Sequence, residues 1–151
     1  MAKQHNLRKG RISEAGRAYL LTIVTAARRP ILRDFHCASV VARSIHYHGR
    51  AGWVENLAWV IMPDHVHWLL VLQERGRLDQ LMRSFKSYTA QTVNALLGGV
   101  GAPLWQPGYH DHAVRRDEDL RRLARYVIAN PLRAGLTEDL GLYPWWDATW
   151  L

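Results

Sequence analysis

Two histidines separated by one residue, His65 and His67, open an apolar run, HVHWLLVL, that is typical of a β-strand. Side chains alternate across a strand, so both imidazoles should leave it on one face about 7 Å apart, where they could share a cation. Tyr126 and Asn130 lie four residues apart in a segment with helical character, which places a phenol and an amide on one surface. Together these groups could bind a divalent metal and attack a phosphodiester through a tyrosine oxygen.

The chain contains two further His-x-His triplets, and their expected surroundings differ. His46 and His48 fall in a predicted helix, where residues two apart point about 200° away from each other, so a shared metal is not expected there. His110 and His112 fall in or beside a short strand and could face the same way. The triplet at 65–67 is favoured because flanking strands would hold it rigidly, as a two-ligand metal site requires.

A third protein ligand would have to come from another element. Mg²⁺ and Mn²⁺ accept nitrogen, oxygen and water ligands, and Asn130 is the candidate, with Asp64 and Asp111 as rivals. An asparagine before Pro131 is also typical of a helix end that has no metal role. Tyr126 is one of six tyrosines, and a helical tyrosine most often only packs its ring, so its assignment depends on the nearby asparagine.

The elements that must position these groups follow from periodicity and turn residues. Apolar, β-branched runs predict four strands, at 18–25, 53–62, 65–72 and 109–115. Apolar stripes at helical spacing predict three helices, at 35–48, 77–97 and 117–129, the first with Asp34 as its N-cap. This order predicts an α+β fold: a ferredoxin-like antiparallel sheet (β-α-β-β-α-β) with an additional C-terminal helix carrying Tyr126. One face of such a sheet still needs a cover from another helix, a partner chain or a ligand.

At 151 residues the chain is expected to form one domain, 1–151, with a basic N-terminal arm at 1–17 and an aromatic C-terminal tail at 137–151. The net charge is +7, and the excess lies in the first third, since residues 1–50 carry ten Lys or Arg and two acidic residues. This asymmetry favours a polyanionic partner, nucleic acid before membrane, over a merely solubilising surface. The single cysteine, Cys37, excludes a disulfide framework within the chain and fits a reducing cytoplasm. No apolar stretch approaches the roughly 18 residues of a membrane span, and no signal peptide is recognisable.

Four sequence blocks resemble the single-tyrosine HUH transposases of the IS200/IS605 type and, more narrowly, the REP-associated tyrosine transposases of bacteria. In chain order they are WVIMPDHVH (59–67), WQPGYHDHAVR (105–115), YVIANPLRAGL (126–136) and YPWW (143–146). A single His-x-His triplet is weak evidence, whereas the four blocks in this order are specific.

The resemblance implies a histidine pair on the central sheet of a ferredoxin-like fold and a tyrosine on a helix. It implies that His65, His67 and Asn130 bind Mg²⁺ or Mn²⁺ and that Tyr126 is the nucleophile. Members of the family attack single-stranded DNA, form a 5′-phosphotyrosine link and leave a free 3′-OH, and the REP-associated branch recognises short hairpins. The residues that we expect to contact DNA are Lys3, Arg8, Lys9, Arg11, Arg115, Arg122, Arg125 and Trp105.

Two other functions stay open at this point. The chain could be a binding module for structured DNA or RNA without catalysis, or a metal-dependent phosphodiesterase that uses water, with Tyr126 structural. The target hairpin and the preferred cation also stay open, as do monomer or homodimer, and a role in transposition or only in cleavage and binding of repeats.

Overall fold

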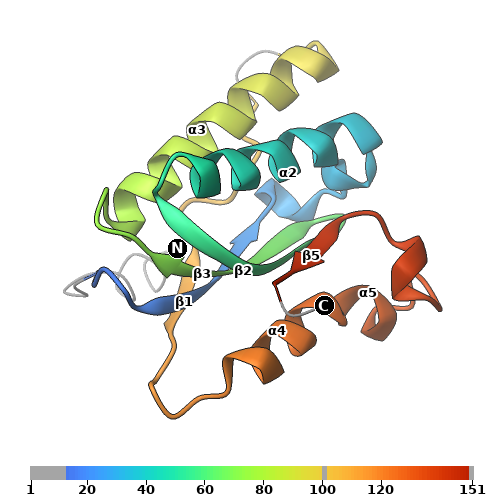
Figure 1. Ribbon diagram of the computed structural model, residues 1–151. Coiled ribbons are helices and arrows are strands. Elements are labelled where there is room, and N and C mark those ends of the chain that lie inside the picture. Colours follow the sequence, from blue (N-terminus) through green and yellow to red (C-terminus); the bar gives the residue numbers. More distant parts are fainter. Residues whose placement is uncertain (1–12, 100–101, 150–151) are drawn as a thin grey trace.

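The computed structural model describes residues 13–99 and 102–149, and a five-stranded antiparallel sheet lies at its centre (Figure 1). The strands are β1 (Ala18–Val24), β2 (Val54–Ile61), β3 (His65–Leu72), β4 (His110–Ala113) and β5 (Trp146–Ala148). Their order across the sheet is β4-β1-β3-β2-β5. β3 is therefore the central strand, with β1 and β2 hydrogen-bonded to its two edges.

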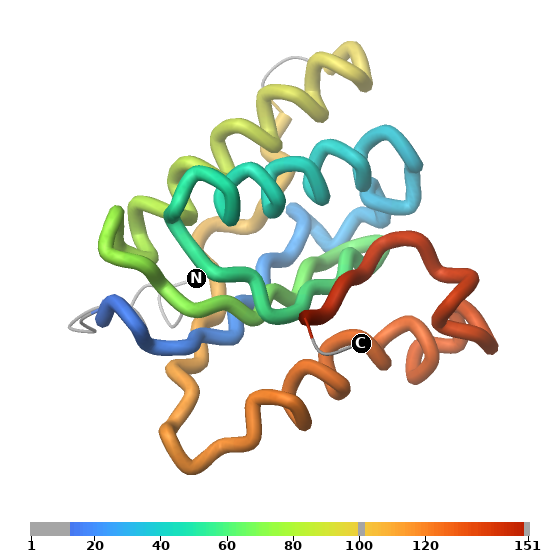
Figure 2. The backbone as a smooth tube through the Cα atoms, viewed as in Figure 1, coloured from blue at the N-terminus to red at the C-terminus, as the bar shows by residue number. Residues whose placement is uncertain are grey.

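Helices cover both faces of the sheet, as Figures 1 and 2 show. α2 (Phe35–Arg50) and α3 (Leu78–Leu97) lie on one face, and α4 (Leu120–Ile128) and α5 (Asn130–Arg133) lie on the other. Side chains of β3 alternate between the two layers: Trp68 and Leu70 join the core under α2 and α3, whereas Leu69 joins the smaller core under α4. His65 and His67 are in phase with Leu69, so they lie on the α4 side of the sheet.

The residues at helix ends explain where the helices start. The Asp34 carboxylate accepts a hydrogen bond from the Cys37 backbone N–H and caps α2, as predicted. Asp119 caps α4 by accepting from the backbone N–H groups of Arg121 and Arg122. The helix predicted from residue 117 therefore begins at Leu120, because the capping aspartate lies outside the helix.

A break separates α4 from α5 just after the tyrosine. Pro131 has no N–H to donate to the Val127 carbonyl, and the side-chain amide of Asn130 donates to that carbonyl instead, at 2.9 Å. Asn130 was expected at the end of one helix but opens a second, one-turn helix. The break turns the chain so that the residues of α5 return toward α4.

The predicted α+β, ferredoxin-like fold is confirmed, and α4 with α5 supplies the cover for its second face. The sequence indicates only an aromatic tail over 137–151, whereas in the structure β5 pairs with β2. The Tyr143 hydroxyl also donates to the Ile61 carbonyl at 2.6 Å, which fixes the tail to the sheet. Within residues 13–99 and 102–149, no helix is long and apolar enough to cross a membrane.

Candidate metal and nucleophile site

His65 and His67 stand side by side on the α4 side of the central strand. Their ring centroids are 4.8 Å apart, and their planes meet at 79°. His67 pairs in register with Thr22 of β1 and with Val60 of β2, so the strand that carries the rings is held on both edges. Two imidazoles at this separation on a rigid strand can each direct one nitrogen toward a common ion.

The hydrogen bonds of the two rings determine which nitrogens remain for a ligand. An Asp64 carboxylate oxygen lies 2.7 Å from Nδ1 of His65, and because a carboxylate only accepts, this Nδ1 carries a proton. Nδ1 of His67 lies 3.0 Å from the hydroxyl oxygen of Thr22. Both Nδ1 atoms are engaged by the protein, which leaves Nε2 of each ring as the atom that can bind a metal.

The protonation state of His67 suits the same role. Burial, with smaller contributions from the charges of His65 and Arg133, lowers the pKa of His67 to about 4. The ring is therefore neutral at neutral pH. A neutral imidazole is the form that binds metal, so protons do not compete for His67 under ordinary conditions.

Asp64 is held in place by a small network around the turn that precedes β3. Burial opposes ionisation of Asp64, but the hydrogen bonds from His65 and Arg28 outweigh it and lower the pKa of this carboxyl group. Arg28 lies 2.9 Å from the second carboxylate oxygen, and the buried Thr25 hydroxyl donates to the Asp64 backbone carbonyl at 3.0 Å. Arg28 and its neighbour Ala27 have φ values of 51° and 55°, a left-handed conformation that non-glycine residues rarely adopt. Backbone strain of this kind is retained where the surroundings fix it, here by the contacts of Thr25 and Asp64.

Tyr126 lies on α4 and is 59% exposed, so its ring is open to solvent. The guanidinium of Arg133 lies over that ring, 3.9 Å from the centroid, and its Nη2 donates to the Tyr126 carbonyl at 2.7 Å. Arg133 therefore lies beside the candidate nucleophile, and its charge is one of the smaller causes that lower the pKa of His67. Sequence reasoning missed Arg133, although it lies in the same block as Tyr126, because only the break at Asn130 returns it to α4.

Asn130 and the two rival ligands occupy different places. The Nδ2 of Asn130 is committed to the Val127 carbonyl, so its amide oxygen is the atom that could bind a cation. Asp64 contacts Nδ1 of His65, so it orients the ring and does not itself face the expected metal. Asp111 pairs in register with Leu21, whose side chain lies in the core under α2 and α3, on the other face of the sheet.

No group of three or more His, Cys, Asp or Glu residues that could hold a metal occurs in the described part of the chain. A cation at His65 and His67 would therefore take its remaining ligands from amide, phosphate or water oxygens. That mixed nitrogen and oxygen donor set fits Mg²⁺ or Mn²⁺, which leave positions open for a phosphate.

The histidines of the other two triplets have different surroundings. His48 is buried between α2 and α3, whereas His46 is exposed and packs edge-on against Trp59, so the two rings point apart as predicted. His112 is exposed on β4 and lies 3.0 Å from a carboxylate oxygen of Glu118.

The expected DNA contacts fall into three groups. Arg115, Arg122 and Arg125 are exposed on or just before α4, on the same side of the sheet as Tyr126. Trp105 differs from the expectation: it is 6% exposed, its Nε1 donates to the Thr89 hydroxyl at 2.9 Å, and a base cannot stack on it without opening the core. Four of the expected contacts lie outside the described residues: Lys3, Arg8, Lys9 and Arg11.

Comparison with known proteins identifies relatives of this chain. The family model for IS200-like transposases matches residues 15–130. A REP-associated tyrosine transposase of Escherichia coli K12 is 29% identical over 87 residues, which are 58% of this chain and 50% of that protein. A relative from Haemophilus influenzae, which carries the same name provisionally, is 25% identical over 104 residues, with 60% of this chain and 57% of the relative covered. The chain thus spans about half the length of these relatives.

One solved structure shares the fold over most of the chain. A REP-associated tyrosine transposase bound to a REP hairpin superposes with a TM-score of 0.71 at 23% identity, covering 90% of this chain and 79% of that one. The likeness agrees with the arrangement of sheet and helices described above.

Proposed function

Because the chain belongs to the family of IS200-like transposases, we propose that it cleaves and rejoins single-stranded DNA at hairpin-forming repeats through a covalent bond to Tyr126. One observation carries the proposal. The sheet face with the paired imidazoles is the face covered by the Tyr126 helix, and Arg133 contacts Tyr126 there. The similarity to REP-associated transposases supports repeats of that kind as the substrate class.

The reaction exchanges one phosphodiester bond for another. The phenol of Tyr126 loses its proton, and its oxygen attacks phosphorus. The bond from phosphorus to the 3′ oxygen breaks, that oxygen takes up a proton, and the 5′ phosphate stays on the tyrosine. Attack by another strand's 3′-OH on the phosphotyrosine would transfer the strand and release Tyr126.

The surrounding residues would bind and orient the phosphate. His65 and His67, with the amide oxygen of Asn130, would hold Mg²⁺ or Mn²⁺. When bound, the ion supplies positive charge that stabilises the phosphate during displacement. Arg133, and Arg122 one helical turn before Tyr126, add fixed positive charge on the same side of the sheet.

Mapping the covalent adduct tests this function directly. The protein is incubated with Mn²⁺ and labelled hairpins that carry single-stranded flanks, and SDS-resistant adducts are digested with trypsin. Cleavage after Arg125 and Arg133 releases residues 126–133, which contain one tyrosine, so the adduct should map to that peptide. Tyr126→Phe should abolish the adduct and leave the melting temperature nearly unchanged, because the side chain is largely exposed.

Other outcomes would assign the two remaining functions. Metal-dependent cleavage that persists in Tyr126→Phe, with no adduct in the wild type, would identify a phosphodiesterase that uses water. Tight hairpin binding without cleavage under any divalent cation would identify a binding module. Either result would refute the proposed function.

A further inference from the structure

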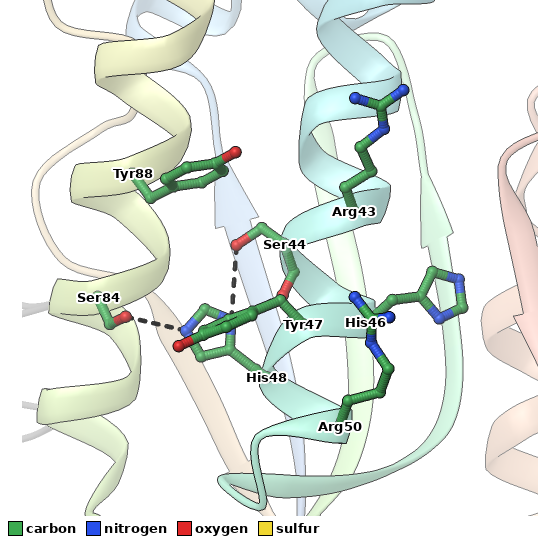
Figure 3. A pocket seen from close by; sticks show the side chains of 8 residues that line it. All are labelled: Arg43, Ser44, His46, Tyr47, His48, Arg50, Ser84 and Tyr88. Carbon is green, nitrogen blue, oxygen red and sulfur yellow. Dashed lines mark hydrogen bonds between the residues drawn. The ribbon is translucent and has the colours of Figure 1, made fainter.

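A second candidate site lies in the groove between α2 and α3, on the side of the sheet away from Tyr126 (Figure 3). The groove has a volume of about 690 Å³. Its lining comes from these two helices alone and consists of Arg43, Ser44, His46, Tyr47, His48, Arg50, Ser84 and Tyr88. The lining contains two arginines and no acidic residue.

Two tyrosines stand over the groove from opposite sides. Tyr47 on α2 is 52% exposed and Tyr88 on α3 is 53% exposed, although both are large aromatic side chains. In Figure 3 the rings of Tyr47 and Tyr88 extend from their helices toward the gap between α2 and α3, where Ser44, Ser84 and His48 also lie. Exposed aromatic rings facing a gap are the usual platform on which proteins stack unpaired bases.

The floor of the groove is polar, uncharged and fixed. His48 is 1% exposed, and its Nδ1 lies 2.7 Å from the Ser44 carbonyl, so this nitrogen donates. Nε2 then accepts from the Ser84 hydroxyl at 2.9 Å. Burial lowers the pKa of His48, so the ring stays neutral. Positive charge in the groove therefore comes from its arginines.

The arginines are spaced along one stripe of α2. Arg43, Tyr47 and Arg50 follow each other at intervals of four and three residues, which places them on one surface of the helix. A guanidinium on each side of a stacking ring matches a strand in which a base is flanked by two phosphates. This charge complementarity favours a nucleic-acid strand over an apolar peptide or a second copy of the chain.

We propose that the α2–α3 groove binds an unpaired stretch of single-stranded DNA, with bases against Tyr47 and Tyr88 and phosphates at Arg43 and Arg50. Its assignment to DNA rather than RNA rests on the proposed function. The groove and Tyr126 lie on opposite sides of the sheet, so the strand held here is a segment other than the one cleaved. The groove would retain the flank of a hairpin while another part of the same strand reaches Tyr126.

Binding of fluorescein-labelled dT12 without divalent cation tests the groove independently of cleavage. Tyr47→Ala/Tyr88→Ala should weaken binding about 30-fold or more, because each lost stacking contact with a base costs at least about fivefold in affinity. Tyr47→Phe/Tyr88→Phe should retain wild-type affinity, because it keeps both ring faces. Arg43→Gln/Arg50→Gln should also weaken binding and reduce the slope of log affinity against log salt by about 1 to 2. Arg83→Gln/Arg116→Gln removes two charges at exposed arginines outside the lining, so it is the charge-matched control and should leave affinity unchanged.

Photo-crosslinking with 5-iododeoxyuridine in place of one thymidine should mark Tyr47 or Tyr88. Equal affinity of the wild type and the double alanine variant would overturn the proposal, as would tighter binding of rU12 than dT12 at these residues. A wild-type dimer that Tyr47→Ala/Tyr88→Ala dissociates in sedimentation would overturn it too, by showing an interface between copies. If the wild type binds dT12 at the groove but forms no adduct at Tyr126, the proposed function is refuted and the groove proposal is retained.

Discussion

Arg133 lies beside the candidate nucleophile. It lies over the Tyr126 ring, donates to the Tyr126 carbonyl and acts on His67. Arg133→Gln should slow adduct formation about 10- to 100-fold at saturating hairpin, because a cation–ring contact and a charged hydrogen bond are lost. The rate of adduct formation in Arg133→Lys should lie between the rates of the wild type and Arg133→Gln, since lysine keeps the charge without the planar group. Arg121→Gln, at an exposed position of α4, is the control, and an equal loss there would refute a specific role for Arg133.

Asp64 should matter for the metal rather than for the nucleophile. Its carboxylate fixes the proton of His65 on Nδ1, and removing such a partner typically weakens metal binding about 10- to 100-fold. We expect this loss for Asp64→Asn when Mn²⁺ is titrated into Tyr126→Phe protein and followed by electron paramagnetic resonance. Arg28→Gln removes only the outer partner of Asp64 and should cost less. Unchanged Mn²⁺ affinity in Asp64→Asn would show that the carboxylate does not support a metal ligand.

His67 should make the fold sensitive to acid. Its pKa is about 4 in the folded protein against an ordinary value of 6.5, so the unfolded chain binds more protons between these values. The contribution to stability is complete above pH 6.5 and falls as pH drops toward 4, by roughly 2 kcal/mol between pH 7 and 4.5. The free energy of unfolding should therefore decrease more on acidification in the wild type than in His67→Gln. Urea unfolding at both pH values measures the difference, and parallel decreases would contradict a depressed pKa.

At the scale of elements, long periodic segments were predictable and short ones were not. The apolar runs of β1, β2 and β3 and the stripes of α2 and α3 repeat often enough to predict each element nearly to its ends. β5 has three residues, and only pairing with β2 makes it a strand. The start of α5 depends on the amide of Asn130 replacing the missing N–H of Pro131, a contact that no periodicity reports. The position of Arg133 escaped prediction for the same reason.

The Asp119 cap should contribute measurably to the stability of α4, because this helix is short. This helix has nine residues, a length at which helices are marginal without tertiary contacts and caps. Asp119→Ala should lower the free energy of unfolding by about 1 kcal/mol and speed hydrogen exchange in α4, because two backbone N–H groups lose their acceptor. Asp117→Ala removes an exposed carboxylate whose ion pair is with Arg115, and should change stability by less than about 0.5 kcal/mol. Equal effects of the two variants would contradict a capping role.

At the scale of the whole molecule, the sheet separates two polar surfaces. The α4 side carries the paired imidazoles and Tyr126, and the α2 side carries the groove of Tyr47 and Tyr88. The sequence predicts the first surface because strand alternation and helical spacing place its residues. It did not predict the second, because Tyr47 and Tyr88 are 41 residues apart and only the packing of α2 against α3 brings them together. A local sequence pattern predicts which side chains share one face of a single element. The residues that line a groove between two elements depend on how those elements pack.

The basic N-terminal arm should affect the salt dependence of DNA binding by the whole chain, because the excess positive charge lies in the first third of the sequence. Each phosphate neutralised by a Lys or Arg releases condensed counterions, so log affinity for DNA falls linearly with log salt, by about 0.7 to 0.9 per contact. A variant that replaces four basic residues by glutamine should show a slope smaller by up to about 3. The four positions are Lys3, Arg8, Lys9 and Arg11.

A control variant removes the same formal charge at Arg77, Arg83, Arg116 and Arg121. Fluorescence anisotropy with one hairpin from 50 to 300 mM salt gives both slopes. If both variants lower the slope equally, the effect reflects net charge alone. If the arm variant keeps the wild-type slope, the arm makes no phosphate contact.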